Sequence, residues 1–196
     1  MKAITFLKPN LVDIEMISDT KSKIVIQPLE RGFGHTLGNA LRRVLLSSMP
    51  GSAVTEVSID NILHEYSTID GVQEDVLEII LNIKKLAVVL HEKDKIEVVL
   101  RKKGKGPVLA SDIEEHPNLE IKNPDFSLAN ITNDKTELVI NLTISQGKGY
   151  QPATKRKFNE LEDLGIGKMQ VDASFTPVEK VSVSYTHLRA HETPLH

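Results

Sequence analysis

Hydrophobic residues recur at helical spacing within residues 29–51, and this segment predicts the most distinctive element of the chain. The apolar stripe consists of Leu37, Leu41, Val44, Leu45 and Ser48. Thr36 stands where its hydroxyl could accept from the backbone N–H groups of a first helical turn, and Pro50 ends the periodic pattern. The pattern therefore predicts one helix with a sharp start at Thr36 and a sharp stop before Pro50.

Leu46 falls nearly opposite this stripe, because successive helical residues are rotated by about 100°. Asn39, Arg42 and Arg43 flank Leu46. A surface helix with a single apolar face would carry a charge at that position. Two interpretations remain open: a helix with a core or dimer on one side and a partner on the other, or a helix buried all round by its own chain.

Most other segments alternate apolar and polar residues, as strands with one buried face do. Such segments are residues 11–17, 23–27, 53–59, 95–101, 137–145 and 169–175, and residues 181–185 suggest one more. Residues 11–27 read as a half-buried hairpin. A second helix is expected over roughly residues 73–86, with Glu74 and Asp75 at the positive end of its dipole and an apolar stripe of Val76, Ile79, Ile80 and Ile83. Residues 102–107 and 146–157 are expected to be basic loops, and residues 109–136 short apolar pieces among turns. Several strands with two helices indicate an α+β fold.

Composition limits the function classes. The chain has 196 residues, 40% hydrophobic and 26% charged, as expected for a soluble globular protein of one large or two small domains. A net charge of −3 argues against a general nucleic-acid binder. Cysteine is absent, so thiolate metal sites and disulfides are excluded. No long apolar run or signal pattern is present, which predicts a cytoplasmic protein without a membrane span.

Several motifs in a fixed order resemble the amino-terminal domain of the bacterial RNA polymerase alpha subunit. They are ERGFGHTLGNALRR from Glu30, LLSSMPG from Leu45, HEYST at residues 64–68, GVQED at 71–75, GKGY ending at Tyr150, and VDASFTPVEKV at 171–181. The resemblance covers roughly residues 1–183. It implies a dimerisation domain made of residues 1–52 and about 172–185, with a mainly-β domain inserted at 53–171. Residues 186–196 match no part of that family.

The resemblance implies a non-catalytic assembly subunit of DNA-directed RNA polymerase, a nucleotidyltransferase complex, with no cofactor and no catalytic residue of its own. In that family the domain dimerises and carries the beta and beta-prime subunits, so DNA is reached only through the complex. The apolar stripe would form the dimer contact. The residues expected to contact beta or beta-prime are Arg43, Arg42, Asn39, Leu46, His64, Glu65, Asp75 and Glu179. Residues 172–181 would also touch one of the large subunits.

Arg43 is favoured over Arg42 because the family's beta contact runs through the second arginine of the pair. An arginine there can make bidentate hydrogen bonds to a partner carboxylate. The family's DNA-contacting second domain and second dimerisation helix have no counterpart in this sequence. The expectation is therefore a dimer weaker than that of the full-length family, with a mobile tail after residue 185.

The main alternative is a small phosphate- or nucleotide-binding enzyme that uses the turn at Gly32 and Gly34. A glycine turn before a helix can bind phosphate at the helix N-terminus. However, the third glycine, Gly38, comes one residue late for a dinucleotide-binding pattern, and no Lys-Ser/Thr pair follows. The glycines could equally supply special backbone angles and allow a close approach to a neighbouring segment.

Metal and nucleic-acid sites have weaker support. His64-Glu65 and His91-Glu92 each resemble half of a zinc-protease motif without the second histidine. His187 and His191 have the spacing of metal ligands on a helix, but lie in the unmatched tail. Lys148, Lys155, Arg156 and Lys157 could touch phosphates, although the chain has only 4% aromatic residues for base stacking. A solvated or partner-facing loop is the favoured interpretation of these lysines and arginine.

Overall fold

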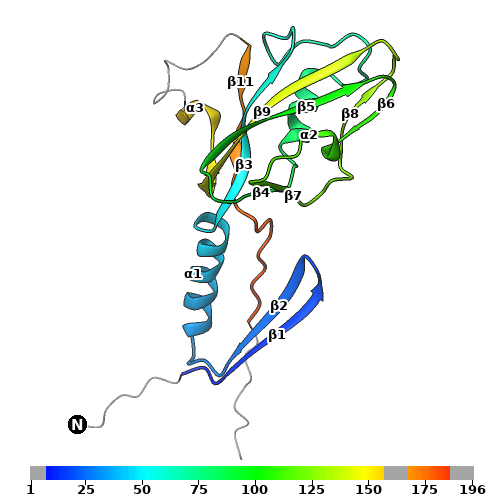
Figure 1. Cartoon of the computed structure of the whole chain (residues 1–196). Helices are drawn as coiled ribbons and strands as arrows, with labels where there is room; N and C mark the ends of the chain where they lie inside the picture. The colour runs from blue at the N-terminus through cyan, green and yellow to red at the C-terminus, as the bar shows by residue number, and fades with distance from the viewer. Residues whose placement is uncertain (1–7, 157–166, 186–196) are drawn as a thin grey trace, which may run out of the picture. The chain divides into compact units, whose positions relative to one another are not determined.

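The computed structural model describes residues 8–156 and 167–185, and it confirms the α+β class (Figure 1). The helices are α1 (Phe33–Ser47), α2 (Val76–Ile83), α3 (Ala153–Arg156) and the 3-10 helix η1 (Ala110–Asp112). The strands are β1 (Leu11–Ser18), β2 (Lys21–Gln27), β3 (Pro50–Ile59), β4 (Val88–Leu90), β5 (Lys95–Lys103), β6 (Gly106–Leu109), β7 (Leu119–Ile121), β8 (Ser127–Ile131), β9 (Glu137–Lys148), β10 (Tyr150–Gln151), β11 (Lys168–Gln170) and β12 (Ala173–Ser174).

The chain divides into two compact units, which are described separately. Unit 1 comprises residues 1–44 and 180–196, and unit 2 comprises residues 45–179. The domain boundaries that the resemblance implies, near residues 53 and 172, stay a prediction.

Unit 2 is built on an antiparallel sheet in the order β11-β3-β9-β5. Strand β9 carries the alternation expected from the sequence, with Leu138, Ile140, Leu142 and Ile144 at most 1% exposed. These side chains point to one face of the sheet because consecutive strand residues face opposite sides. They join a single hydrophobic core that also takes in α2, β6 and β8.

Helix α2 confirms the predicted apolar stripe. Val76, Ile79, Ile80 and Ile83 are buried, and the Asn82 side-chain amide donates to the carbonyl of Leu128 on β8 at 3.1 Å. The expected length of residues 73–86 is wrong at both ends. Before the helix, the Gln73 N–H donates to the Asn130 carbonyl at 2.9 Å instead of joining a helical turn. After it, the N–H groups of Lys85 and Leu86 donate to carbonyls only three residues back, a tighter turn than the α-helix.

Several predicted loops and strands differ from the structure. Residues 102–107 are not a continuous loop, because β5 runs to Lys103 and β6 begins at Gly106. Residues 146–157 likewise include the end of β9, all of β10 and the helix α3. The strand expected over residues 169–175 is split into β11 and β12, while residues 181–185 form no strand. The strand ends within residues 102–107 and 146–157 contain glycine and polar residues, which are typical of loops. These residues form strands because pairing with a partner strand outweighs their local propensity.

The predicted hairpin of unit 1 is confirmed in its pairing. Val12 pairs with Ile26 and Ile14 with Ile24, so that these four residues share one face with Met16. The expectation that this face would be half-buried is wrong: Ile14 is 62% exposed and Met16 72%. The alternation indicates which face of the hairpin is apolar, but the described residues of unit 1 do not bury that face.

Helix α1 begins at Phe33, so the predicted cap at Thr36 is wrong. The Phe33 N–H donates to the Glu30 carbonyl at 3.0 Å, and Gly32 adopts a φ of +84° that closes the turn. Thr36 therefore lies inside the first turn of the helix. The helix ends at Ser47, and β3 starts at Pro50, so the predicted stop before Pro50 is confirmed.

Candidate partner-binding surfaces

The apolar stripe of α1 remains accessible. No residue of the helix is buried; Leu41 is 41% and Val44 50% exposed, while Leu37 and Leu45 are half-buried. Ser48 is exposed and follows the last helical residue. The interpretation of a helix buried all round by its own chain is therefore wrong for the described residues. The stripe is available as a contact surface for another chain.

The second face of α1 carries the residues expected to dock a large subunit. Asn39, Arg43 and Leu46 follow one another at intervals of four and three residues, which places them on one side of the helix. Asn39, Arg42 and Arg43 are exposed, and Leu46 is half-buried. The Leu46 carbonyl accepts a hydrogen bond from the Thr176 hydroxyl at 2.9 Å, which satisfies one of the free carbonyls at the helix C-terminus.

Of the two glycines inside α1, Gly38 is explained by packing within unit 1. A Cβ atom at Gly38 would stand 2.6 Å from a methyl carbon of Val183, and one at Gly34 would stand 3.5 Å from the Tyr185 ring. The rings of Tyr185 and His35 are also in contact, with centroids 3.9 Å apart. Val183 therefore occupies the space that Gly38 leaves open, as the packing interpretation of the sequence requires, whereas a Cβ atom at Gly34 would make only an ordinary contact.

The segment before α2 holds His64, Glu65 and Asp75, each expected to bind a large subunit. His64 is exposed and Glu65 half-buried. The His64 Nδ1 atom shares a hydrogen bond with the Ser67 hydroxyl at 3.1 Å, and the Ser67 carbonyl accepts from the Val76 N–H at 3.1 Å. These bonds fix the segment locally, while the His64 side chain stays exposed.

Asp75 has a local structural role that the sequence only partly indicated. Its Oδ1 accepts from the Glu78 N–H at 2.7 Å, so Asp75 is the N-cap of α2. The sequence placed its neighbour Glu74 at the helix N-terminus, but did not indicate that the two Glu74 carboxylate oxygens accept from the backbone N–H and side-chain amide of Asn130 at 2.7 and 2.9 Å. The two residues are 56 positions apart, and no local pattern connects them.

Glu179 is exposed near the end of unit 2, after a segment held tightly to the sheet. A Cβ atom at Gly51 would stand 1.8 Å from the Phe175 carbonyl oxygen, and one at Gly147 2.6 Å from the Phe175 ring. Gly51 and Gly147 are direct partners across β3 and β9. The paired glycines therefore let the Phe175 segment lie directly on the backbone of the sheet.

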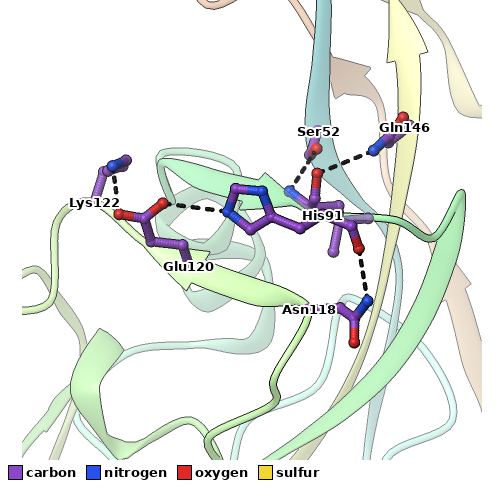
Figure 2. Close-up of polar contacts among 7 residues, drawn as sticks. Ser52, His91, Asn118, Glu120, Lys122 and Gln146 are labelled. Atoms are coloured by element: carbon purple, nitrogen blue, oxygen red, sulfur yellow. Dashed lines mark hydrogen bonds and ion pairs between the residues drawn. The ribbon is translucent and has the colours of Figure 1, made fainter.

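Figure 2 shows a polar cluster at the end of β4 that joins several strands. The Leu90 N–H donates to the Ser52 hydroxyl at 3.1 Å, and the Gln146 side chain donates to the Leu90 carbonyl at 3.0 Å. The His91 N–H donates to the Asn118 carbonyl, and the Asn118 side-chain amide donates to the His91 carbonyl. These hydrogen bonds connect β4 to β3 and β9, so the cluster has a structural role.

The charged edge of the same cluster consists of His91, Glu120 and Lys122. The His91 Nε2 lies 3.4 Å from a Glu120 oxygen, and Lys122 contacts the other oxygen (Figure 2). The Lys122 bond, followed by the His91 bond, lowers the pKa of the Glu120 carboxyl. Both His91 and Glu120 are about half exposed, so solvent screens this interaction.

The metal and phosphate candidates of the sequence lie partly within the described residues and partly outside them. Within residues 8–156 and 167–185, no cluster of three or more histidines or acids could hold a metal ion. His187, His191 and Lys157 lie outside the described residues. Lys148 and Lys155 are exposed, on β9 and α3 respectively. No helix in the described ranges has both the length and the apolar character needed to cross a membrane.

The fold thus combines a well-packed, strand-rich unit 2 with a unit 1 whose described residues contain no buried side chain. The residues that the structure describes therefore leave the apolar side chains of unit 1 accessible. Residues 57–176 match the family model of the RNA polymerase Rpb3/RpoA insert domain. The chain belongs to this family, as an RNA polymerase alpha-type subunit.

Proposed function

We propose that this chain is a non-catalytic assembly subunit of DNA-directed RNA polymerase, working in the cytoplasm. In this role it pairs with a second alpha chain through the stripe of α1 and docks the beta and beta-prime subunits. Its contribution to transcription is architectural, and DNA is reached only through the assembled enzyme.

The observation that carries this proposal is the missing core of unit 1. Its described residues, 8–44 and 180–185, include no buried side chain. The large apolar residues left exposed there are Leu11, Val12, Ile14, Met16, Ile17, Ile24, Phe33, Leu41 and Val44. An apolar surface of this extent is characteristic of protein–protein contact and is rare on monomers. By contrast, every buried apolar residue of the described chain belongs to unit 2.

The docking half of the proposal rests on the polar side of α1 and the segment before α2. On one face of α1, Asn39 presents an amide, Arg43 a charge and Leu46 an apolar group. This combination suits the rim and core of an interface. His64, Glu65, Asp75 and Glu179 are the proposed additional contacts. We also propose that residues 53–171 act as an inserted domain, with residues 1–52 and 172–185 forming the dimerisation domain.

The competing enzyme hypothesis has no observation in its favour. Gly34 and Gly38 lie within α1, where Val183 and Tyr185 fill the adjacent space. Gly38 therefore has a packing role that requires no bound phosphate, and Gly34 lies inside the helix and not in a turn before it.

Co-purification tests the proposed function. A tagged full chain should retain beta and beta-prime from a mixture of purified subunits and should self-associate in sedimentation experiments at rising concentration. Equilibrium dialysis against nucleotides should show no binding. A chain that binds nucleotide and retains neither large subunit would overturn the proposal.

A further inference from the structure

Asp172 connects three segments of unit 2 that are distant in sequence. It follows β11 and precedes β12, the strand that pairs with β10 through Tyr150 opposite Ser174 and Gln151 opposite Ala173. Beyond β10 the chain enters α3. The segment of residues 150–156 is thus attached to the rest of unit 2 beside Asp172.

The Asp172 carboxylate has a contact to each of these segments. Its Oδ1 accepts from the Ala153 N–H, the first residue of α3, at 2.8 Å. The same carboxylate also raises the pKa of the Tyr150 phenol, so the two groups interact. On the other side, the Lys84 Nζ at the C-terminal end of α2 lies 3.7 Å from Oδ2.

Charge reinforces this geometry. The Ala153 hydrogen bond is the main cause that lowers the pKa of the Asp172 carboxyl; the Tyr150 bond and Lys84 lower it further, while partial burial opposes them. The carboxylate is therefore ionised at neutral pH and accepts charge-assisted hydrogen bonds, which are stronger than bonds between neutral groups.

The anchored segment carries exposed groups. Tyr150 is 63% exposed and Lys155 is exposed on α3. Two β10 pairs and one turn of helix are too few to fix such a segment by backbone bonds alone, because short isolated elements are marginally stable. The Asp172 carboxylate, which is bonded to the first residue of α3 and paired with Lys84 at the C-terminal end of α2, supplies the missing constraint.

We propose that Asp172 is a positioning residue that fixes residues 150–156, and through them the surface that this segment gives to a large polymerase subunit. The second part rests on the proposed docking function. Asp172 acts through Tyr150 and Ala153; its own carboxylate is used inside the chain and does not contact the partner.

Amide hydrogen exchange followed residue by residue in the full chain tests the positioning, and capture of beta and beta-prime tests its consequence. In Asp172→Ala the Ala153 amide should exchange about tenfold faster or more, because a hydrogen bond to a charged acceptor is lost. Asp172→Asn should fall between Ala and wild type, since its side-chain oxygen still accepts. Tyr150→Phe should accelerate exchange less, and Lys84→Gln least. Asp125→Asn removes an exposed carboxylate elsewhere in unit 2 and should change neither measurement.

The outcomes separate the two parts. Unchanged exchange in a folded Asp172→Ala chain overturns the positioning role, including when capture falls, because that result would make Asp172 a direct contact. Faster exchange with undiminished capture overturns the link to docking. If the wild-type chain captures neither large subunit, the proposed function and the link to docking both fail, while the exchange result still decides the positioning role.

Discussion

Gly38 leaves the space that Val183 occupies: a Cβ atom at position 38 would lie 2.6 Å from the Val183 Cγ1 atom. At Gly34, one turn earlier in α1, the nearest atom to such a Cβ is a Tyr185 ring carbon at 3.5 Å, an ordinary contact distance. The same substitution should therefore have opposite effects at two positions of one helix.

Gly38→Ala should displace residues 183–185 from α1, although alanine favours a helix by about 1 kcal/mol over glycine. Gly34→Ala should keep the packing and gain part of that helix propensity. The contact between the His35 and Tyr185 rings, followed by NMR, is the measurement. Equal retention of the ring contact in both variants would show that Val183 moves aside without loss.

Gly147→Ala should destabilise unit 2 by about 1–3 kcal/mol, because the added methyl meets the Phe175 ring in a packed site. Phe175 is 3% exposed, so Phe175→Ala alone should cost about 3–5 kcal/mol. The double variant should cost less than the two single changes together, since removal of the ring also removes the clash. Denaturant unfolding of all four chains measures this coupling, and strictly additive values would contradict it.

The parts of unit 2 that could be predicted are those where one residue's neighbours in sequence are also its neighbours in space. The alternation in β9 and the stripe of α2 depend on local periodicity, and both are present. The bonds from Glu74 to Asn130 and from Asp172 to Ala153 join residues 56 and 19 positions apart, and no periodic pattern encodes such pairs. Pairing across strands likewise extended β9 and β5 into segments that read as loops.

The candidate surface on α1 was predicted differently. Periodicity indicated that the apolar stripe and Leu46 lie on opposite sides of the helix. It could not distinguish a helix buried by its own chain from a helix that contacts a second protein chain. That choice depends on the whole environment of the helix. The exposure of Leu41 and Val44 excludes cover from the described residues, while the identity of the occupant stays a prediction.

Leu41→Ala should weaken self-association more than it weakens the fold of the single chain. Leu41 is 41% exposed, so its truncation leaves no closed cavity within one chain. In a dimer the same side chain would be covered, and its loss would remove part of the contact. Sedimentation at several concentrations should report a weaker dimer, with an unchanged melting curve for unit 2. A dimer as tight as wild type would remove Leu41 from the proposed interface.

Arg43→Ala should reduce retention of beta while the fold stays intact, because Arg43 is exposed on the face opposite the stripe. Loss of one partner of a buried charge pair at an interface costs about 2–5 kcal/mol. Arg42→Ala, which removes the same charge about 100° around the helix, is the matched control and should lose less. Retention of beta at wild-type strength by Arg43→Ala, or an equal loss in the control, would contradict the assignment.

The pKa of the Tyr150 phenol should depend directly on the charge of the Asp172 carboxylate. Partial desolvation, and then the hydrogen bond and negative charge of Asp172, raise the pKa of Tyr150 above its ordinary value of 10.0. A raised folded-state pKa stabilises the fold below the unfolded value and loses that contribution as the pH rises through the folded value. For Asp172 the pKa is lowered, so its contribution is present above 3.8 and is lost as the pH falls below it. The contact between the two residues is therefore strongest between these limits.

Asp172→Asn should lower the Tyr150 pKa towards 10.0, because the charge that opposes phenolate formation is gone while desolvation remains. The chain has three tyrosines and no tryptophan, so phenolate absorbance is not obscured by indole. Subtracting the titration of Tyr150→Phe from that of each parent chain isolates the Tyr150 transition. Asp125→Asn should leave this transition in place. A Tyr150 pKa that stays unchanged or rises in Asp172→Asn would show that the hydroxyl does not rest on the Asp172 carboxylate in solution.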